Sequence, residues 1–296
     1  MESIDELKSN ISGEPKYKLR NGDLFVSPGG IHFLDYLDPV GEISTEIDAA
    51  KLTDEESCYI EKALQSNDER FENQVNIVKS HLQQSISKVI DIGCGGGLFL
   101  SKFKNLGSEV VGVELNDSRA QYAKTIHGLE IHKRPIESSF WPENYSEYFD
   151  AVTIWDVIEH VNYPLATLRS ATKVLKKNGL IFIDTPCRDS FYHRFGELSY
   201  KISNGAFPTF LNTMYSSHLF GHKQIFSTIE MKSLLESAGL EVVLVKKFHE
   251  LSFPHSYYLK MMLKSDLLVK LALPLVKIFL FVFPVKNKML AIARKK

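Results

Sequence analysis

The sequence predicts an α/β fold built on a doubly wound sheet of seven strands. The sheet is expected to be mostly parallel, with an antiparallel last strand and helices on both faces. Two observations carry this prediction. Short apolar segments alternate with helical patterns along most of the chain, which is typical of parallel sheets joined by right-handed crossovers. The 296 residues also have an ordinary globular composition, with 44% hydrophobic and 24% charged residues.

The elements follow each other in a regular order. Strands are expected at 88–92, 110–114, 129–131, 149–154, 179–183, 240–245 and 289–293. Apolar residues at spacings of three and four predict helices near 71–82, 98–106, 118–126, 164–174 and 227–238. In such a sheet, ligands bind outside the carboxyl ends of the strands. The loops that follow the strands are therefore the first place to look for a site.

The domain organisation is less regular at the start of the chain and between the later strands. Residues 1–65 lack clear periodicity and are predicted to form an N-terminal extension ahead of a single domain at 66–296. Two insertions interrupt that domain. Segment 186–225 is rich in aromatic residues and is expected to act as a lid, and segment 252–284 is apolar and basic. Both are expected to determine the substrate.

Charge and cysteine content exclude several classes of protein. The formal net charge is −1, which does not favour a nucleic-acid binder. The three cysteines, Cys58, Cys94 and Cys187, are widely spaced and odd in number, which disfavours a disulfide framework or a zinc ribbon. The first ten residues are acidic and lack the apolar core of a secretory signal. A cytoplasmic location is therefore expected.

The end of the chain carries a distinct signal. From residue 251 onwards there are nine basic residues and one acidic residue, so this segment has a net charge of +8. It includes the fifteen residues 271–285, which contain one lysine and two prolines and fall short of the ~20 apolar residues that span a bilayer. Two interpretations stay open: a buried or lid helix, or an amphipathic segment that meets anionic lipid or an apolar substrate. The second would place 252–296 peripherally at the inner face of a membrane.

A glycine-rich loop follows the first predicted strand. The loop contains Gly93, Gly95 and Gly97, which permit a tight turn and a close approach of the backbone to a ligand. Glu114 ends the second predicted strand 21 residues after Gly93, near the spacing expected of an acid that binds ribose hydroxyls. A dinucleotide-binding loop would have a small residue where Leu98 stands. This disfavours a nicotinamide cofactor and an NAD(P)-dependent oxidoreductase.

Three stretches carry a resemblance to a known family. They are VIDIGCGGG at 89–97, FDAVTIWDVIEHV at 149–161 and HKQIFS at 222–227. The first resembles motif I of class I S-adenosylmethionine-dependent methyltransferases, and the second resembles their fourth-strand motif. The loop is most similar to that of ubiquinone-biosynthesis-type O-methyltransferases. The resemblance implies a Rossmann-like fold and S-adenosyl-L-methionine as the cofactor.

The resemblance also implies roles for individual residues. Glu114 would hold the ribose, with Leu115 beside the adenine, and Trp155 would lie over the cofactor. The methionine part of the cofactor would be lined by Asp91, Gly93, Cys94, Gly95 and Gly97. Ile136 and Glu137 match the adenine-side position that follows the third strand.

Methyl transfer to a hydroxyl needs a base, and histidine is the usual one near neutral pH. His160, His222 and His218 are the candidates, because all three are expected at the ligand edge of the sheet, and His160 and His222 are assigned the catalytic role. Asp156, Glu159 and His160 would share one face if this stretch were helical. The ubiquinone-type family has an acid, an acid and a histidine in this register, which would suit a divalent metal. The prediction nevertheless assigns no metal ligand.

Together these features predict a methyltransferase that acts on a small or lipid-linked acceptor, most readily at oxygen. A non-catalytic protein that binds S-adenosylmethionine stays open as an alternative, because motif I reports binding and not turnover. A nucleic-acid methyltransferase is disfavoured by the acidic main body and by Ile154-Trp155-Asp156-Val157 after the fourth strand, where an Asn/Asp-Pro-Pro-aromatic motif would be expected. No nucleic-acid partner is expected.

Overall fold

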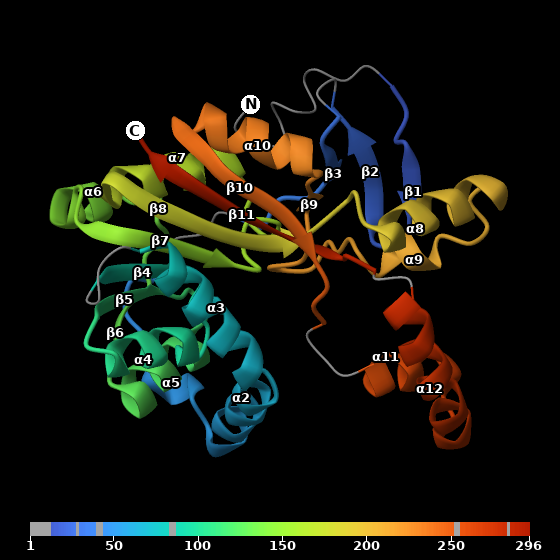
Figure 1. Cartoon of the computed structure of the whole chain (residues 1–296), viewed down its shortest axis with the longest axis horizontal. Helices are drawn as coiled ribbons and strands as arrows, with labels where there is room; N and C mark the ends of the chain where they lie inside the picture. Colours follow the sequence, from blue (N-terminus) through green and yellow to red (C-terminus); the bar gives the residue numbers. More distant parts are fainter. Residues whose placement is uncertain (1–12, 28–29, 40–43, 83–86, 252–254, 283–284) are drawn as a thin grey trace.

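The structure is a computed structural model, which describes residues 13–27, 30–39, 44–82, 87–251, 255–282 and 285–296. Among these residues, the main body is an α/β sandwich around one large sheet, with a small second sheet at one end of the molecule (Figure 1). Part of the predicted N-terminal extension, 1–12, and residues 252–254 and 283–284 of the apolar segment lie outside the described residues.

The main sheet has seven strands in the order β10-β11-β8-β7-β4-β5-β6. β4, β5, β6, β7 and β8 pair in parallel, whereas β11 lies antiparallel to both of its neighbours, β8 and β10. The strands are β4 (Lys88–Ile92), β5 (Glu109–Val113), β6 (Glu130–His132), β7 (Phe149–Trp155), β8 (Leu175–Pro186), β10 (Leu240–Phe248) and β11 (Lys288–Lys295). The predicted fold class is confirmed, including the antiparallel strand. β8 starts four residues earlier than expected.

Helices cover both faces of this sheet (Figure 1). One face carries α3 (Asp68–His81), α4 (Leu98–Asn105) and α5 (Asp117–His127), and the other carries α6 (Phe140–Tyr145), α7 (Pro164–Val174) and α10 (Thr228–Ser237). Neighbouring strand residues point to opposite faces: Val89 packs with α3 and α4, whereas Ile90 packs with α7 and α10. This alternation buries both faces of the central strands, and β7 is buried along its whole length.

A small sheet joins the N-terminal segment to the first insertion. Its strands are β1 (Tyr17–Leu19), β2 (Gly22–Val26), β3 (His32–Leu34) and β9 (Gln224–Ile225), in the order β1-β2-β3-β9. The insertion also forms α8 (Phe191–Ile202) and α9 (Thr209–Asn212), which pack on this sheet through Leu211 and Tyr215. Segments 180 residues apart therefore fold together.

The remaining elements lie at the edges. The 3₁₀ turn η1 (Ala49–Lys51) and α2 (Asp54–Ser66) lead into α3. The second insertion forms α11 (His255–Leu263) and α12 (Asp266–Val282), a helical hairpin that projects from the body (Figure 1). The N-terminal segment thus carries ordered strands and a helix, although the sequence showed no periodicity there.

Phe103 on α4 tests the packing of the first face. Its side chain is 1% exposed between the sheet and α3. Phe103→Ala leaves a cavity that the surrounding strands cannot fill, so we expect the free energy of unfolding to fall by about 3–5 kcal/mol in urea denaturation. Leu106→Ala is the matched control, because Leu106 is 45% exposed at the end of the same helix. An equal loss in both variants would contradict this account of the core.

Candidate active site

The glycine loop after β4 is shaped by left-handed backbone angles. Gly93, Gly95 and Gly97 have φ values of 75°, 56° and 81°, which side chains rarely tolerate. The amides of Gly93 and Cys94 donate to the carbonyl oxygen of Val113 at 2.8 and 3.0 Å, so the loop is tied to the end of β5. At Gly97, a Cβ would lie 2.5 Å from the Leu129 side chain. Only glycine therefore allows α4 to start this close to its neighbours.

Glu114 lies directly after β5 and touches the loop. Its Oε2 accepts the Gly95 amide and its Oε1 accepts the Asn116 amide, both at 2.8 Å. Burial raises the pKa of this carboxyl, and the two amides oppose the shift. An ionised carboxylate has about four acceptor positions. Two positions therefore remain for hydroxyl donors of a ligand.

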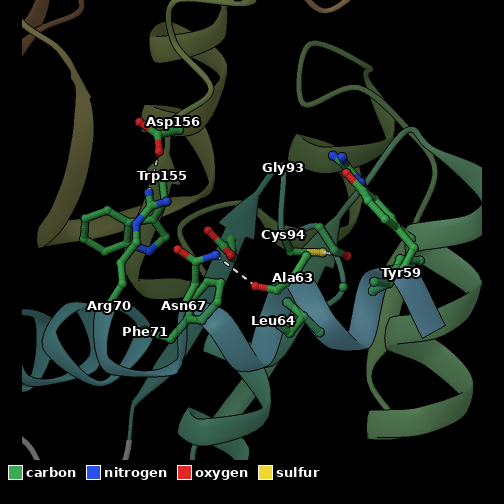
Figure 2. A pocket seen from close by; sticks show the side chains of 15 residues that line it. Tyr59, Ala63, Leu64, Asn67, Arg70, Phe71, Gly93, Cys94, Trp155 and Asp156 are labelled. Carbon is green, nitrogen blue, oxygen red and sulfur yellow. Dashed lines mark hydrogen bonds and ion pairs between the residues drawn. The ribbon is translucent and has the colours of Figure 1, made fainter. Parts of the chain in front are cut away.

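A cavity of about 280 Å³ opens on the glycine loop (Figure 2). One side is formed by the loop and the end of β7, and the other by α2 and α3. Of the predicted cofactor residues, the cavity is lined by Asp91, Gly93, Cys94, Gly95 and Trp155. The lining that the sequence did not predict comprises Tyr59, Ile60, Ala63, Leu64, Asn67, Arg70, Phe71, Gly96, Arg119 and Asp156.

Other predicted cofactor residues do not line this cavity. Gly97 packs beneath the loop and Glu114 reaches it through Gly95, while Leu115 is half-buried beyond β5. Ile136 is 2% exposed in the core on the α7 side. Glu137 accepts a hydrogen bond from Thr167 on α7. The structure therefore does not bring Ile136 and Glu137 to the glycine loop.

Asp91 makes the cavity electrostatically receptive to a cation. The Thr153 hydroxyl donates to its Oδ1 at 2.7 Å. Burial, aided by the nearby Glu114 charge, raises the Asp91 pKa to about 8. A positive group in the cavity would favour the ionised carboxylate and be favoured by it in return. Trp155 adds an aromatic wall, and its ring is held edge-on by Phe99 at 5.7 Å between centroids.

A buried ionic cluster lies under the cavity, and we define it as Arg70, Asp156, Asp184, Glu250 and Lys288. Asp156 contacts Arg70 Nη2 at 2.5 Å (Figure 2) and Lys288 Nζ at 2.6 Å, and its amide donates to Asp184 at 2.8 Å. Burial alone would raise the Asp156 pKa, but Lys288 and Arg70 outweigh it and lower the pKa to about 2. This carboxylate is fully paired with protein cations.

The arrangement corrects one expectation. Asp156, Glu159 and His160 were expected on one face of a helix, but Asp156 has a φ of 51° and residues 156–160 form a bend and a turn. The Asp156 side chain points into the ionic cluster and not toward Glu159. His222 takes its place beside Glu159 and His160, because the first insertion returns to this edge just before β9.

Glu159, His160 and His222 form a second cluster, the acid–histidine cluster. The Nε2 atoms of His160 and His222 lie 3.7 and 3.9 Å from Glu159 Oε1, which has no hydrogen-bond partner in the described part of the chain. Thr185 donates to Oε2 at 2.9 Å. Burial, with the Asp156 charge, raises the Glu159 pKa to about 8, and burial lowers the His160 pKa to about 4. These three atoms converge closely enough to ligate a metal ion, although neither imidazole is within hydrogen-bond distance of Glu159.

Backbone and side-chain contacts hold the acid–histidine cluster in place. The ammonium of Lys223 is fully buried and donates to Asp38 at 2.6 Å and to the His160 carbonyl at 2.7 Å. Asn162 exchanges hydrogen bonds with the Asp38 backbone at 2.9 and 3.0 Å. The N-terminal segment is thus fastened to the turn that carries Glu159. His222 Nδ1 lies 2.9 Å from the Met214 carbonyl, so Nδ1 is the donor and neutral Nε2 keeps its lone pair.

One missed element had a readable signal. Thr53-Asp54-Glu55-Glu56 matches the pattern that starts a helix, and the Thr53 hydroxyl indeed accepts the Glu56 amide at the start of α2. Ile60 and Leu64 of this helix lie against Gly96, where a Cβ would come within 2.9 Å of each. No comparable signal marks the Arg70 and Lys288 partners, because their sequence neighbours are unremarkable lysines, glutamates and apolar residues.

Comparison with known proteins agrees with this architecture. Residues 58–245, more than half of the chain, match the family model described as a methyltransferase domain. The chain belongs to this family, and the prediction of a class I methyltransferase domain, with S-adenosylmethionine as the cofactor of its class, is confirmed.

Individual relatives and solved structures are similar to this chain over different lengths. The chain is 33% identical over 115 residues to a ubiquinone biosynthesis O-methyltransferase from Stutzerimonas stutzeri, over 38% of this chain and 49% of the relative. It thus spans about half the length of the curated relatives it matches. Solved S-adenosylmethionine-dependent methyltransferases share the fold. One from Thermotoga maritima is 20% identical (80% of this chain, 94% of that chain, TM-score 0.50). One from Methanosarcina mazei is 16% identical (74% and 96%, TM-score 0.50).

The raised pKa of Glu159 has a measurable consequence. Between about pH 7 and pH 8 the unfolded chain has already lost this proton, while the folded chain retains much of it, so stability should fall as pH rises. We expect Glu159→Gln to remove about 1 kcal/mol of that fall in urea denaturation at the two pH values. His160 is neutral across this window.

Glu236→Gln, at an exposed position on α10, is the control for this measurement. It should keep the wild-type change in stability between the two pH values. An identical pH dependence in wild type and Glu159→Gln would show that Glu159 is already ionised in the folded protein.

Proposed function

We propose that this protein transfers a methyl group from S-adenosylmethionine to a small or lipid-linked acceptor, most readily at an oxygen atom. The observation that carries the proposal is the direct contact between Glu114 and Gly95 of the glycine loop, which lines the cavity. A loop that exposes backbone beside a carboxylate is suited to an adenosine-bearing ligand.

The residues present fit this cofactor. The two unused acceptor positions of Glu114 match the two donors of a ribose diol. Asp91 would pair with a positive group of the methionine part, since its burial without a cation is unfavourable. Trp155 offers an aromatic face that attracts a sulfonium. Gly93, Cys94 and Gly95 would lie along the ligand, with Gly97 setting the start of α4 behind them.

The adenine side of the site draws on two residues that the sequence did not single out. Leu115, Ile136 and Glu137 remain predictions from the resemblance, because none of them lines the cavity. Tyr59 and Arg119 do line it, and an aromatic ring beside a guanidinium is suited to stacking on a base. We therefore include them in the proposed cofactor site.

When bound, the cofactor supplies an electrophilic methyl group, and the chain's own groups must receive the proton of the acceptor. His222 is suited to this role because its Nε2 keeps a lone pair and burial lowers its pKa, so it is neutral near pH 7. Glu159 Oε1 lies 3.9 Å from this atom, so a positive charge on the ring would favour ionisation of Glu159. His160 stands 4.7 Å away, ring to ring, and is the second candidate. These assignments use no metal ion.

The nature of the acceptor is proposed from the relatives. The relatives named as ubiquinone biosynthesis O-methyltransferases favour methylation at oxygen and an acceptor with an apolar part. The predicted lid 186–225 supplies His222, but none of its residues lines the cavity. A cytoplasmic location with peripheral contact to the inner face of a membrane through 252–296 remains part of this proposal.

Glu114→Ala tests the cofactor site. Loss of two hydrogen-bond positions on a charged acceptor should weaken S-adenosylmethionine binding at least about tenfold in calorimetric titration. Glu109→Ala is the control, because Glu109 starts the same strand at the opposite edge of the sheet. Unchanged affinity in Glu114→Ala would contradict the ribose assignment. Tighter binding of NAD than of S-adenosylmethionine would favour an oxidoreductase instead.

His222→Gln tests catalysis. Transfer of labelled methyl from the cofactor into cell extract should label a product in the wild type, and we expect the rate to fall about 10²–10⁴-fold in this variant while cofactor affinity stays unchanged. His218→Gln serves as the control from the same loop. Cofactor binding without any labelled product would favour a non-catalytic binding protein.

A further inference from the structure

Helix α12 carries an apolar surface that none of the described residues covers. Five large side chains of the helix are between 48% and 68% exposed: Leu267, Leu268, Leu271, Leu275 and Ile278. Monomeric soluble proteins rarely leave such contiguous apolar side chains in water. The buried interpretation of the apolar segment is therefore wrong for this helix, and something outside the described chain must cover it.

The exposed apolar side chains lie on one side of α12, and another side of the helix packs on α11. Val269 is buried, and Ala272, Leu273 and Val276 on the same side are half-buried, where α12 contacts α11. The exposed leucines occupy roughly a third of the circumference away from that contact. Helix α12 thus has one apolar side for α11 and a second for another partner.

Lysines border the exposed apolar side. Lys270 and Lys277 are exposed and seven residues apart, so they project from the same side of the helix, next to the leucines. Lys260 and Lys264 add positive charge, and Asp266, paired with Lys260 at 3.0 Å, is the single acid of the hairpin 255–282. The hairpin therefore has a net charge of +3, although the whole chain has −1. The occupant must be apolar and bear negative charge at its surface.

Length and sequence exclude a spanning helix. α12 has 17 residues and contains Pro274, and no helix among the described residues is long and apolar enough to cross a bilayer. A helix with one apolar side bordered by lysines instead lies along the boundary between lipid headgroups and acyl chains. The hairpin also projects from the body, away from the main sheet (Figure 1).

We propose that the α11–α12 hairpin docks on an anionic phospholipid bilayer, with α12 lying parallel to the membrane surface. Leu267, Leu271, Leu275 and Ile278 insert among the acyl chains, while Lys270 and Lys277 contact lipid phosphates. The inference rests on the membrane contact of the proposed function and specifies it, but it does not depend on the methyl-transfer reaction, because docking uses no residue of the cavity or of the acid–histidine cluster.

Co-sedimentation of the full chain with vesicles tests the docking. The vesicles contain phosphatidylcholine alone or phosphatidylcholine mixed with phosphatidylglycerol, and no cofactor is added. We expect binding to the mixed vesicles that weakens as salt is raised. Leu271→Glu/Leu275→Glu and Lys270→Glu/Lys277→Glu should each weaken it at least about tenfold. Ile229→Glu, at an isolated apolar position that is 78% exposed on α10, should bind as the wild type does.

Several outcomes would overturn the proposal. One is the absence of binding to the mixed vesicles, and another is wild-type binding by Leu271→Glu/Leu275→Glu. Sedimentation velocity without lipid identifies a competing occupant: a stable wild-type dimer that becomes a monomer in Leu271→Glu/Leu275→Glu would assign the surface to a second copy of the chain. Thermal unfolding of each variant shows whether the fold is intact, and the lysine variant keeps the test valid if the leucine variant does not fold.

Discussion

Three carboxylates and two cations meet in the buried ionic cluster at the carboxyl edge of the sheet. Taking such charges out of water costs several kcal/mol each, so the cluster persists only because Arg70 and Lys288 each touch several of the acids at once. Its members come from α3, β8, β11 and the segments that follow β7 and β10. The cluster therefore sets the position of α3 against the glycine loop, and with it the wall of the cavity.

Asp156 and Glu159 are three residues apart, yet their surroundings shift their pKa values in opposite directions. Asp156 has a cation on each oxygen and its pKa is lowered to about 2, whereas Glu159 faces two buried imidazoles and its pKa is raised to about 8. Groups pushed apart in this way mark acid–base function more reliably than groups that merely lie close together. The same short loop thus carries one acid that is ionised near neutral pH and one acid that retains its proton there.

The sheet could be predicted from sequence because its information is local. The central strands β4, β5 and β7 are short segments of mostly apolar residues, and the spacing of the glycine loop and Glu114 predicted their contact correctly. The cavity wall could not be predicted in the same way. Arg70 contacts Asp156, and His222 lies near Glu159, only because distant segments of the chain pack together. No local sequence pattern reports such packing. A helical register that looked plausible for Asp156 failed because the backbone there is left-handed.

Strand β11 lies inside the sheet, between β8 and β10, although it follows both in the chain. During synthesis, this edge of β8 therefore stays unpaired until residues 288–295 have left the ribosome. Until then Asp156 and Asp184 also lack the ammonium of Lys288. A nascent chain of this kind exposes an unpaired, apolar strand edge beside uncompensated acids, and such an edge is a template for pairing with another chain.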